Sequence, residues 1–97
     1  NNVPDNFDLM QNYPNPFNPS TTISYNLPKT SDITLKIYDM LGNEIRTLVN
    51  NETKIAGTYT INWDGKNDKG MGASSGVYFY KLVSSEFNKT LKMILMK

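Results

Sequence analysis

The sequence contains neither cysteine nor histidine. Without cysteine no disulfide framework can form, so the fold must be stabilised by its core alone. Without histidine the chain lacks the commonest general base and the commonest zinc ligand, which argues against a catalytic triad or a histidine-based metal site. We therefore expect a protein that is not an enzyme and that uses no cofactor.

The chain also lacks a strong charge and a long apolar run. Its ten basic and nine acidic side chains leave a net charge of +1 with no block of one sign. This balance offers no electrostatic support for binding nucleic acid or an anionic membrane. No apolar run approaches the roughly 20 residues of a transmembrane helix. The 97 residues suffice for one small domain, which we expect to be a monomer.

The clearest pattern runs from residue 58 to residue 83. In Thr58 to Trp63, large apolar and small polar residues alternate, which predicts a half-buried strand. Residues 64–76 are rich in Gly, Asp, Asn and Ser and predict a loop. Residues 77–83 are aromatic and β-branched and predict a second strand. Trp63 is the only tryptophan, and we expect it to anchor the core.

The rest of the chain also has the pattern of short strands separated by turns. We expect strands at residues 22–27, 33–38, 44–49 and 89–97, with a positive-φ turn at Gly42 and a loop over residues 50–56. The strand from residue 44 breaks strict alternation, which favours a bulge or an early end. No segment has a helical period. The predicted fold is all-β: an immunoglobulin-like antiparallel β-sandwich of about seven strands.

The N-terminal part of the chain has a different sequence pattern. We expect residues 1–11 to be the end of an interdomain linker, with Phe7, Leu9 and Met10 able to pack on the domain. The chain starts without an initiator Met or a signal peptide, so we expect a fragment of a longer protein. Three prolines between residues 14 and 19 favour a rigid turn, with Tyr13 and Phe17 on a sheet edge. A proline-rich docking motif is the alternative, although no second PxxP unit follows.

Two groups of residues are candidates for binding. Asp64, Asn67 and Asp68 share one glycine-rich loop and could hold calcium, but Lys66 departs from the ligand pattern, and Asp and Asn also favour turns. A structural turn is the favoured interpretation, and no metal is expected. Aromatic side chains could stack on sugars, yet Tyr25, Tyr59 and Trp63 fall on predicted inward faces.

The second candidate group for binding lies on the last two predicted strands. Lysine is rarely buried, so Lys81 and Lys92 place their neighbours of the same parity outward. If the strands pair, Val77, Phe79, Ile94 and Met96 form an apolar strip flanked by Lys81 and Lys92, and Lys97 can reach solvent as the terminal residue. These seven are the candidate recognition residues. We hypothesise that a partner recognises this strip and the edge of the last strand, by strand addition. The alternatives are that residues 7–10 cover the strip, or that both faces of these strands are buried.

Several short motifs together resemble a known family. They are Tyr13-Pro14-Asn15-Pro16-Phe17-Asn18-Pro19-Ser20-Thr21-Thr22-Ile23, Ile37-Tyr38-Asp39, Leu41-Gly42, Trp63-Asp64-Gly65, Gly70, Ser75-Gly76-Val77-Tyr78-Phe79-Tyr80-Lys81-Leu82 and Lys92-Met93-Ile94-Leu95-Met96-Lys97. In this order they resemble the type A C-terminal sorting domains of type IX secretion cargo, over nearly the whole chain. The middle motifs also resemble the immunoglobulin-like domain of flagellar hook-capping proteins. The resemblance implies that Pro14, Asn15, Pro16, Gly42, Trp63, Asp64, Gly65 and Gly76 are structural motif residues, and the hook-capping domains share the Trp-Asp-Gly and Ser-Gly-Val-Tyr segments.

The resemblance implies a function that the residues alone do not. It implies that residues 12–97 are a non-catalytic sorting domain at the end of a larger exported protein. Its partners would be a secretion translocon, a sortase-like peptidase and the upstream cargo domain. The location would be the periplasm in transit and then the cell surface or the extracellular space. The alternatives are a structural module, hook-cap-like or adhesive, and a carbohydrate-binding appendage of a secreted hydrolase.

Overall fold

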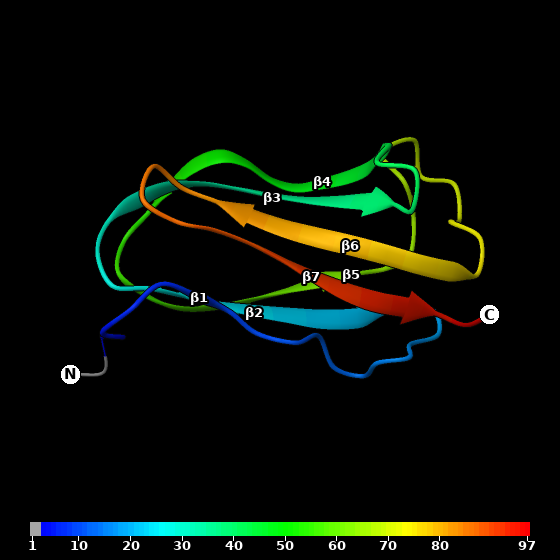
Figure 1. The fold of residues 1–97 in the computed structure, drawn as a ribbon, viewed down its shortest axis with the longest axis horizontal. Coiled ribbons are helices and arrows are strands. Elements are labelled where there is room, and N and C mark those ends of the chain that lie inside the picture. The colour runs from blue at the N-terminus through cyan, green and yellow to red at the C-terminus, as the bar shows by residue number, and fades with distance from the viewer. Residues whose placement is uncertain (1–2) are drawn as a thin grey trace.

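The computed structural model describes residues 3–97, which form seven strands and no helix. The strands pack as two antiparallel sheets, one ordered β1-β2-β5 and the other β4-β3-β6-β7 (Figure 1). This confirms the predicted all-β immunoglobulin-like sandwich. Because the described residues contain no helix, none of them forms one long and apolar enough to cross a membrane. The strand bounds are β1 (Asp8–Leu9), β2 (Thr21–Leu27), β3 (Ser31–Asp39), β4 (Glu44–Lys54), β5 (Gly57–Trp63), β6 (Gly76–Val83) and β7 (Asn88–Leu95).

The smaller sheet follows directly from the alternating sequence. β2 and β5 pair without interruption from Thr21 opposite Trp63 to Leu27 opposite Gly57. Along β2 every second side chain is buried, from Ile23 onward to Leu27. The outward positions of both strands carry only Thr, Ser and Asn. One face of this sheet therefore belongs to the core, and the other face of β2 and β5 is polar and uncharged.

The larger sheet corrects one expectation. β4 continues to Lys54, so most of the loop predicted over residues 50–56 is strand. The predicted bulge is confirmed, because the β3–β4 register shifts in three places and Asn51 has a φ of 47°. The early end is wrong. β4 is an edge strand whose residues 50–53 all face solvent, so the apolar alternation that signals a strand is missing there.

Trp63 is the anchor of the core, as predicted. Its side chain is fully buried, and its ring lies 5.6 Å from Phe17 and 5.6 Å from Tyr78, centroid to centroid. Tilted and edge-on aromatic pairs of this kind are favourable beyond the area that they bury. The indole N–H donates to the carbonyl oxygen of Lys66 at 2.9 Å, so burial leaves its one polar atom satisfied.

The segment expected to be a linker also enters the sandwich. Asp8 and Leu9 form β1 and pair with Asn26 and Tyr25 of β2, and Leu9 is 1% exposed. Phe7 stacks on Phe87 at 5.4 Å. These residues belong to the folded domain, and they pack in the sandwich instead of covering the predicted strip. That residues 1–11 connect this domain to another one stays a prediction.

Candidate recognition surface

The proline-rich segment covers the edge of β7. We call residues 11–17 the clasp. Asn15 Oδ1 accepts the backbone N–H of Ile94 at 3.0 Å, Phe17 donates its N–H to the Ile94 carbonyl at 2.9 Å, and Met96 donates its N–H to the Phe17 carbonyl at 2.9 Å. The clasp therefore occupies the C-terminal part of this edge, so the predicted strand addition would be left with the part of β7 that precedes Lys92. The motif residue Asn15 thus has a structural contact with β7.

One buried hydroxyl joins the clasp to the core. Tyr80 Oη accepts the backbone N–H of Asn12 at 2.8 Å and donates to the carbonyl oxygen of Met10 at 2.8 Å. The ring is fully buried, and burial raises the pKa of Tyr80 to about 12. Asn12 is itself buried and donates from Nδ2 to Thr21 Oγ1 at 3.0 Å. The sequence pattern offers no signal for this contact, because the partners are 68 residues apart.

The predicted strip lies on the outer face of the larger sheet. Val77 is opposite Ile94 and Phe79 is opposite Lys92 in the β6–β7 register. Val77, Phe79 and Ile94 are half-buried by their neighbours, and Met96 is exposed just beyond β7. The structure thus brings the predicted apolar residues together. It also adds Tyr38 of β3, which is opposite Phe79 on the other side of β6.

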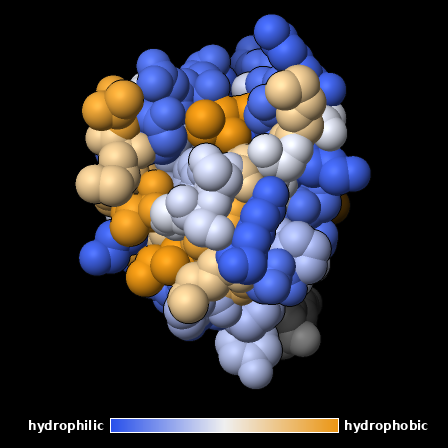
Figure 2. All heavy atoms as spheres, turned by 90° about the vertical axis from the view of Figure 1, so that its right-hand side faces the viewer, coloured by the Kyte–Doolittle hydropathy of each residue, from blue (hydrophilic) through white to orange (hydrophobic). Residues whose placement is uncertain are grey.

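A second apolar group lies at one end of the sandwich. Met40, Leu41, Met71 and Met96 are between 57% and 86% exposed. This end holds the β3–β4 turn, the start of β6 and the end of β7, and Figure 2 shows apolar side chains exposed there among hydrophilic ones. Methionine side chains adapt to different partners, so Met-rich surfaces are suited to recognition. Scattered single residues in the sequence do not signal this group.

The turn itself holds two of these residues outward. The Asp39 carboxylate accepts the backbone N–H groups of Leu41 and Asn43, each at 2.9 Å, and Gly42 adopts a φ of 86°. Two hydrogen bonds from Asn43 to the Asp39 carboxylate lower the pKa of Asp39, and the backbone N–H contributes more than the side-chain amide. Because the turn is closed by these polar contacts, Met40 and Leu41 project into solvent.

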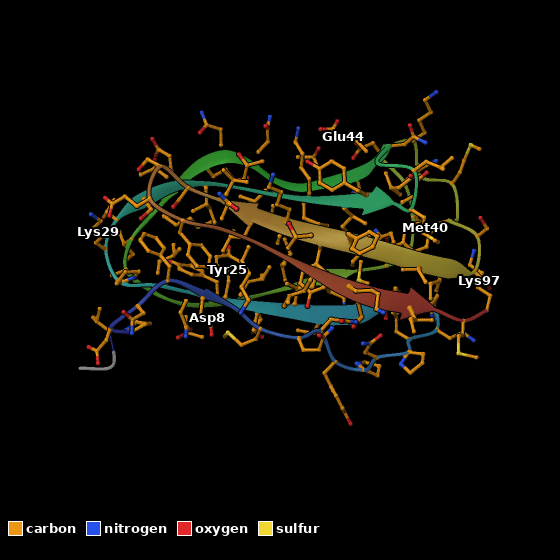
Figure 3. All side chains as sticks on the ribbon, viewed as in Figure 1. Asp8, Tyr25, Lys29, Met40, Glu44 and Lys97 are labelled. Carbon is orange, nitrogen blue, oxygen red and sulfur yellow. The ribbon has the colours of Figure 1, made fainter. Side chains whose placement is uncertain are left out.

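The flanking lysines differ from one another. Lys81 is opposite Lys36 of β3, and Lys36 forms an ion pair with Glu44 that raises the pKa of Lys36. Within residues 3–97, neither Lys81 nor Lys92 has an ion-pair partner. Lys97 lies apart from the strip: its backbone N–H donates to Ser75 Oγ at 2.9 Å, and Figure 3 shows it at the end that also carries Met40.

The candidate calcium loop is organised around an arginine. Arg46 Nη1 lies 3.3 Å from Asp64 Oδ1, and Arg46 Nε lies 3.7 Å from Asp68 Oδ1. Asn67 Oδ1 accepts two backbone N–H groups of its own loop, and Asp68 Oδ1 accepts the N–H of Thr47 at 3.0 Å. Among the described residues no three His, Cys, Asp or Glu side chains are placed to hold a metal ion. A guanidinium thus occupies the position between the two carboxylates, and the favoured structural turn explains all three side chains.

The Trp-Asp-Gly motif is explained by a close backbone approach. Gly65 is buried with a φ of 78°, and a Cβ at this position would lie 2.6 Å from the carbonyl oxygen of Pro19. Asp64 Oδ1 also accepts the N–H of Lys66 at 3.1 Å, which closes the turn. The motif residues are therefore structural, and they fix the loop against the start of β2.

The geometry defines an immunoglobulin-like module whose short sequence motifs close turns and edges. The chain matches the FlgD Ig-like domain family over residues 17–86, which is most of its length. It therefore belongs to this family. No curated protein matches the chain.

Three solved structures have a similar fold. Dimeric latent PorU from Porphyromonas gingivalis is 22% identical, with a TM-score of 0.74, over 93% of this chain and 9% of PorU. PorZ, a surface component of the type-IX secretion system of Porphyromonas gingivalis, is 19% identical, with a TM-score of 0.59, over 96% of this chain and 12% of PorZ. FlgD from P. aeruginosa is 28% identical, with a TM-score of 0.59, over 77% of this chain and 58% of FlgD. This chain thus spans only a small part of PorU and PorZ.

Proposed function

We propose that this domain is a non-catalytic sorting domain of a larger exported protein, which directs that protein across the outer membrane for surface attachment or release. The extent of the structural likeness supports this proposal. The likeness to PorU and PorZ covers 93% and 96% of the chain. Only a few residues of this chain, the clasp and β7 included, can therefore lie outside the aligned part. The FlgD Ig-like match, by contrast, ends at residue 86 and omits β7 entirely.

The proposed partner surface combines the strip with the apolar end. Both groups meet at Met96, which follows the last residue of β7. Apolar side chains with lysines at their rim suit a protein partner that buries the former and pairs with the latter. In this proposal the secretion translocon binds this surface, a sortase-like peptidase acts afterwards, and the cargo precedes the domain in the chain.

A structural module of an extracellular assembly is the second candidate. Membership of the FlgD Ig-like family favours it, as does the 28% identity to FlgD from P. aeruginosa. A carbohydrate-binding role has less support, because Tyr25 and Trp63 are buried and Tyr59 is stacked on Tyr25 at 5.4 Å.

The test is an export assay. Residues 1–97 are fused to the C-terminus of a periplasmic reporter in a bacterium that has a type IX secretion system, with the reporter alone as the negative control. We expect the fusion to reach the cell surface or the medium. A fusion that stays in the periplasm would contradict the sorting proposal and favour the structural module.

Matched variants then locate the surface. Ile94→Ser with Met96→Ser removes apolar area from the strip. The control Ile55→Ser removes an exposed apolar side chain from the connection between β4 and β5, at the opposite end. We expect export to fall for the first variant and to remain for the second, with both domains folded. Equal export of the two would remove the strip from the proposed surface.

A further inference from the structure

The sandwich protects three of its four sheet edges and leaves one without protection. The clasp covers the edge of β7 from Lys92 to Met96, the earlier part of β7 carries the charged Lys89, and β1 is only two residues long. Along β4, Asp68 donates its N–H to the Ile45 carbonyl at 3.0 Å and accepts the N–H of Thr47, and the bulge at Asn51 disrupts the remainder. Short strands, bulges and covering segments are the usual protection of sheet edges. β5 has none of them.

The pairing of β2 shows which backbone groups of β5 point to the open edge. Thr22 exchanges backbone hydrogen bonds with Tyr13, and the Ser24 carbonyl accepts the N–H of Met10, so these groups of β2 point away from β5. In an antiparallel pair the opposite residues then also point away. Those residues are Asn62 and Thr60 and, by alternation, Thr58. Their N–H and C=O groups form the open edge, and none has a backbone partner within residues 3–97.

The side chains of β5 do not protect this edge either. Gly57–Trp63 contains no charge and no proline, and its pairing with β2 runs through seven residues without a shift. Thr58, Thr60 and Asn62 face solvent, while Tyr59 and Ile61 are half-buried at the rim of the core. A regular, uncharged edge of this length is a template for another strand.

We propose that the open edge of β5 pairs with β5 of a second copy of this chain, antiparallel and symmetric about Thr60. The sequence of β5 is self-complementary in this register. Thr60 would face Thr60 of the second copy, and Thr58 would face its Asn62, so three hydrogen-bonded pairs would exchange about six N–H···O bonds. On the inner side Tyr59 would face Ile61 of the second copy, an aromatic–β-branched pair that stabilises antiparallel strands.

The symmetry distinguishes a second copy from an unrelated strand. A two-fold axis through Thr60 makes every contact occur twice, and no pair in this register places like charges opposite each other. The cation at the rim is Lys54, whose Nζ lies 5.5 Å from the Tyr59 ring centroid and 3.4 Å from Glu52. Its charge is already balanced, so it adds little repulsion between the copies.

The expected dimer is weak. One seven-residue edge buries less than the roughly 1,000 Å² of a stable interface. Dimerisation should therefore depend on concentration and become strong where many copies are held together, as on a cell surface. This departs from the monomer that composition alone suggests, and it does not depend on the proposed sorting function.

Sedimentation velocity of residues 1–97 tests the inference. Measured from about 10 µM to about 1 mM, the range in which weak complexes dissociate, the protein should shift from monomer to dimer. Thr60→Lys places two lysines opposite each other on the axis and should abolish the shift. Ser24→Lys is the matched control: it adds the same charge to the same polar face, one strand further from the edge, and should leave the shift unchanged.

Amide hydrogen exchange of the unmodified protein provides a readout without variants. The amides of Thr58, Thr60 and Asn62 should become protected as the concentration rises, while those of Tyr59 and Ile61, which face β2, should be protected throughout. A protein that stays monomeric at the highest concentration would overturn the proposal. So would a dimer that survives in a folded Thr60→Lys variant, or one that leaves the three edge amides unprotected. Edge protection that appears only when further residues are fused to this domain would assign the edge of β5 to another segment and equally exclude the second copy.

Discussion

Removing the Tyr80 hydroxyl tests whether the clasp depends on a single buried contact. In Tyr80→Phe the ring remains and the core keeps its volume, but Asn12 loses the acceptor of its N–H and Met10 loses the donor to its carbonyl. A buried polar group left without a partner costs about 1–3 kcal/mol. The Asn12 N–H contact is buried but the Met10 carbonyl contact is only part-buried, so the second group adds about 1 kcal/mol. The expected loss is about 2–4 kcal/mol, a large share of the roughly 5–15 kcal/mol that stabilise a typical domain.

Urea denaturation measures the loss, and Tyr78→Phe is the matched control. Tyr78 Oη donates to the Ser74 carbonyl at 2.6 Å, but Ser74 is exposed, so water can replace the hydroxyl. The control should lose about 1 kcal/mol or less, and both variants should keep the m-value of the parent. In a thermal melt Tyr80→Phe should unfold about 8–32 °C lower, given about 4–8 °C per kcal/mol in a domain of this size.

Hydrogen exchange shows where the stability is lost. Loosening of the clasp should speed exchange at Ile94 and Met96, whose N–H groups bond to it, before the amides of β3 respond. The reasoning would be refuted if Tyr80→Phe unfolds within about 0.5 kcal/mol of the parent, which is the scatter of a neutral surface change. It would also be refuted if Tyr78→Phe costs as much as Tyr80→Phe.

Three further predictions follow from the loop and the core. Gly65→Ala should strongly destabilise the domain in urea denaturation, because its Cβ would lie 2.6 Å from the Pro19 carbonyl oxygen. The control Gly70→Ala has a φ of 83° but open space around it, so it should cost only about 1 kcal/mol. Equal costs for the two variants would contradict the close approach at Gly65. Burial raises the pKa values of Tyr25 and Tyr80 to about 12, so their contribution to stability should be complete below pH 10 and be lost as the pH rises through about 12; a flat unfolding profile across this interval would count against it. Thermal melts with a chelator and with added calcium should coincide, because arginine occupies the candidate loop, and a marked rise of the melting temperature with calcium would reverse that interpretation.

Most of the architecture could be predicted from the sequence because a half-buried strand has a local signature. Alternation with period two places Ile23, Ile37 and Trp63 in the core, and all three are buried. The same parity argument places Phe79 and Ile94 on one outer face, where the register brings them together. The turn at Gly42 was predictable for the same reason, since a positive φ is a property of single residues.

What the sequence determined by itself is therefore the strands, their inward faces and the turns, because each depends on residues a few positions apart. Only the tertiary structure decided which edges are open, because an edge depends on segments far apart in the chain. The clasp covers β7 through Asn15 and Phe17, more than 70 residues from their partners, and Asp68 closes part of β4 from another loop. β5 shows no difference from other strands in its pattern, and it is an open edge only because no other segment packs beside it among the described residues.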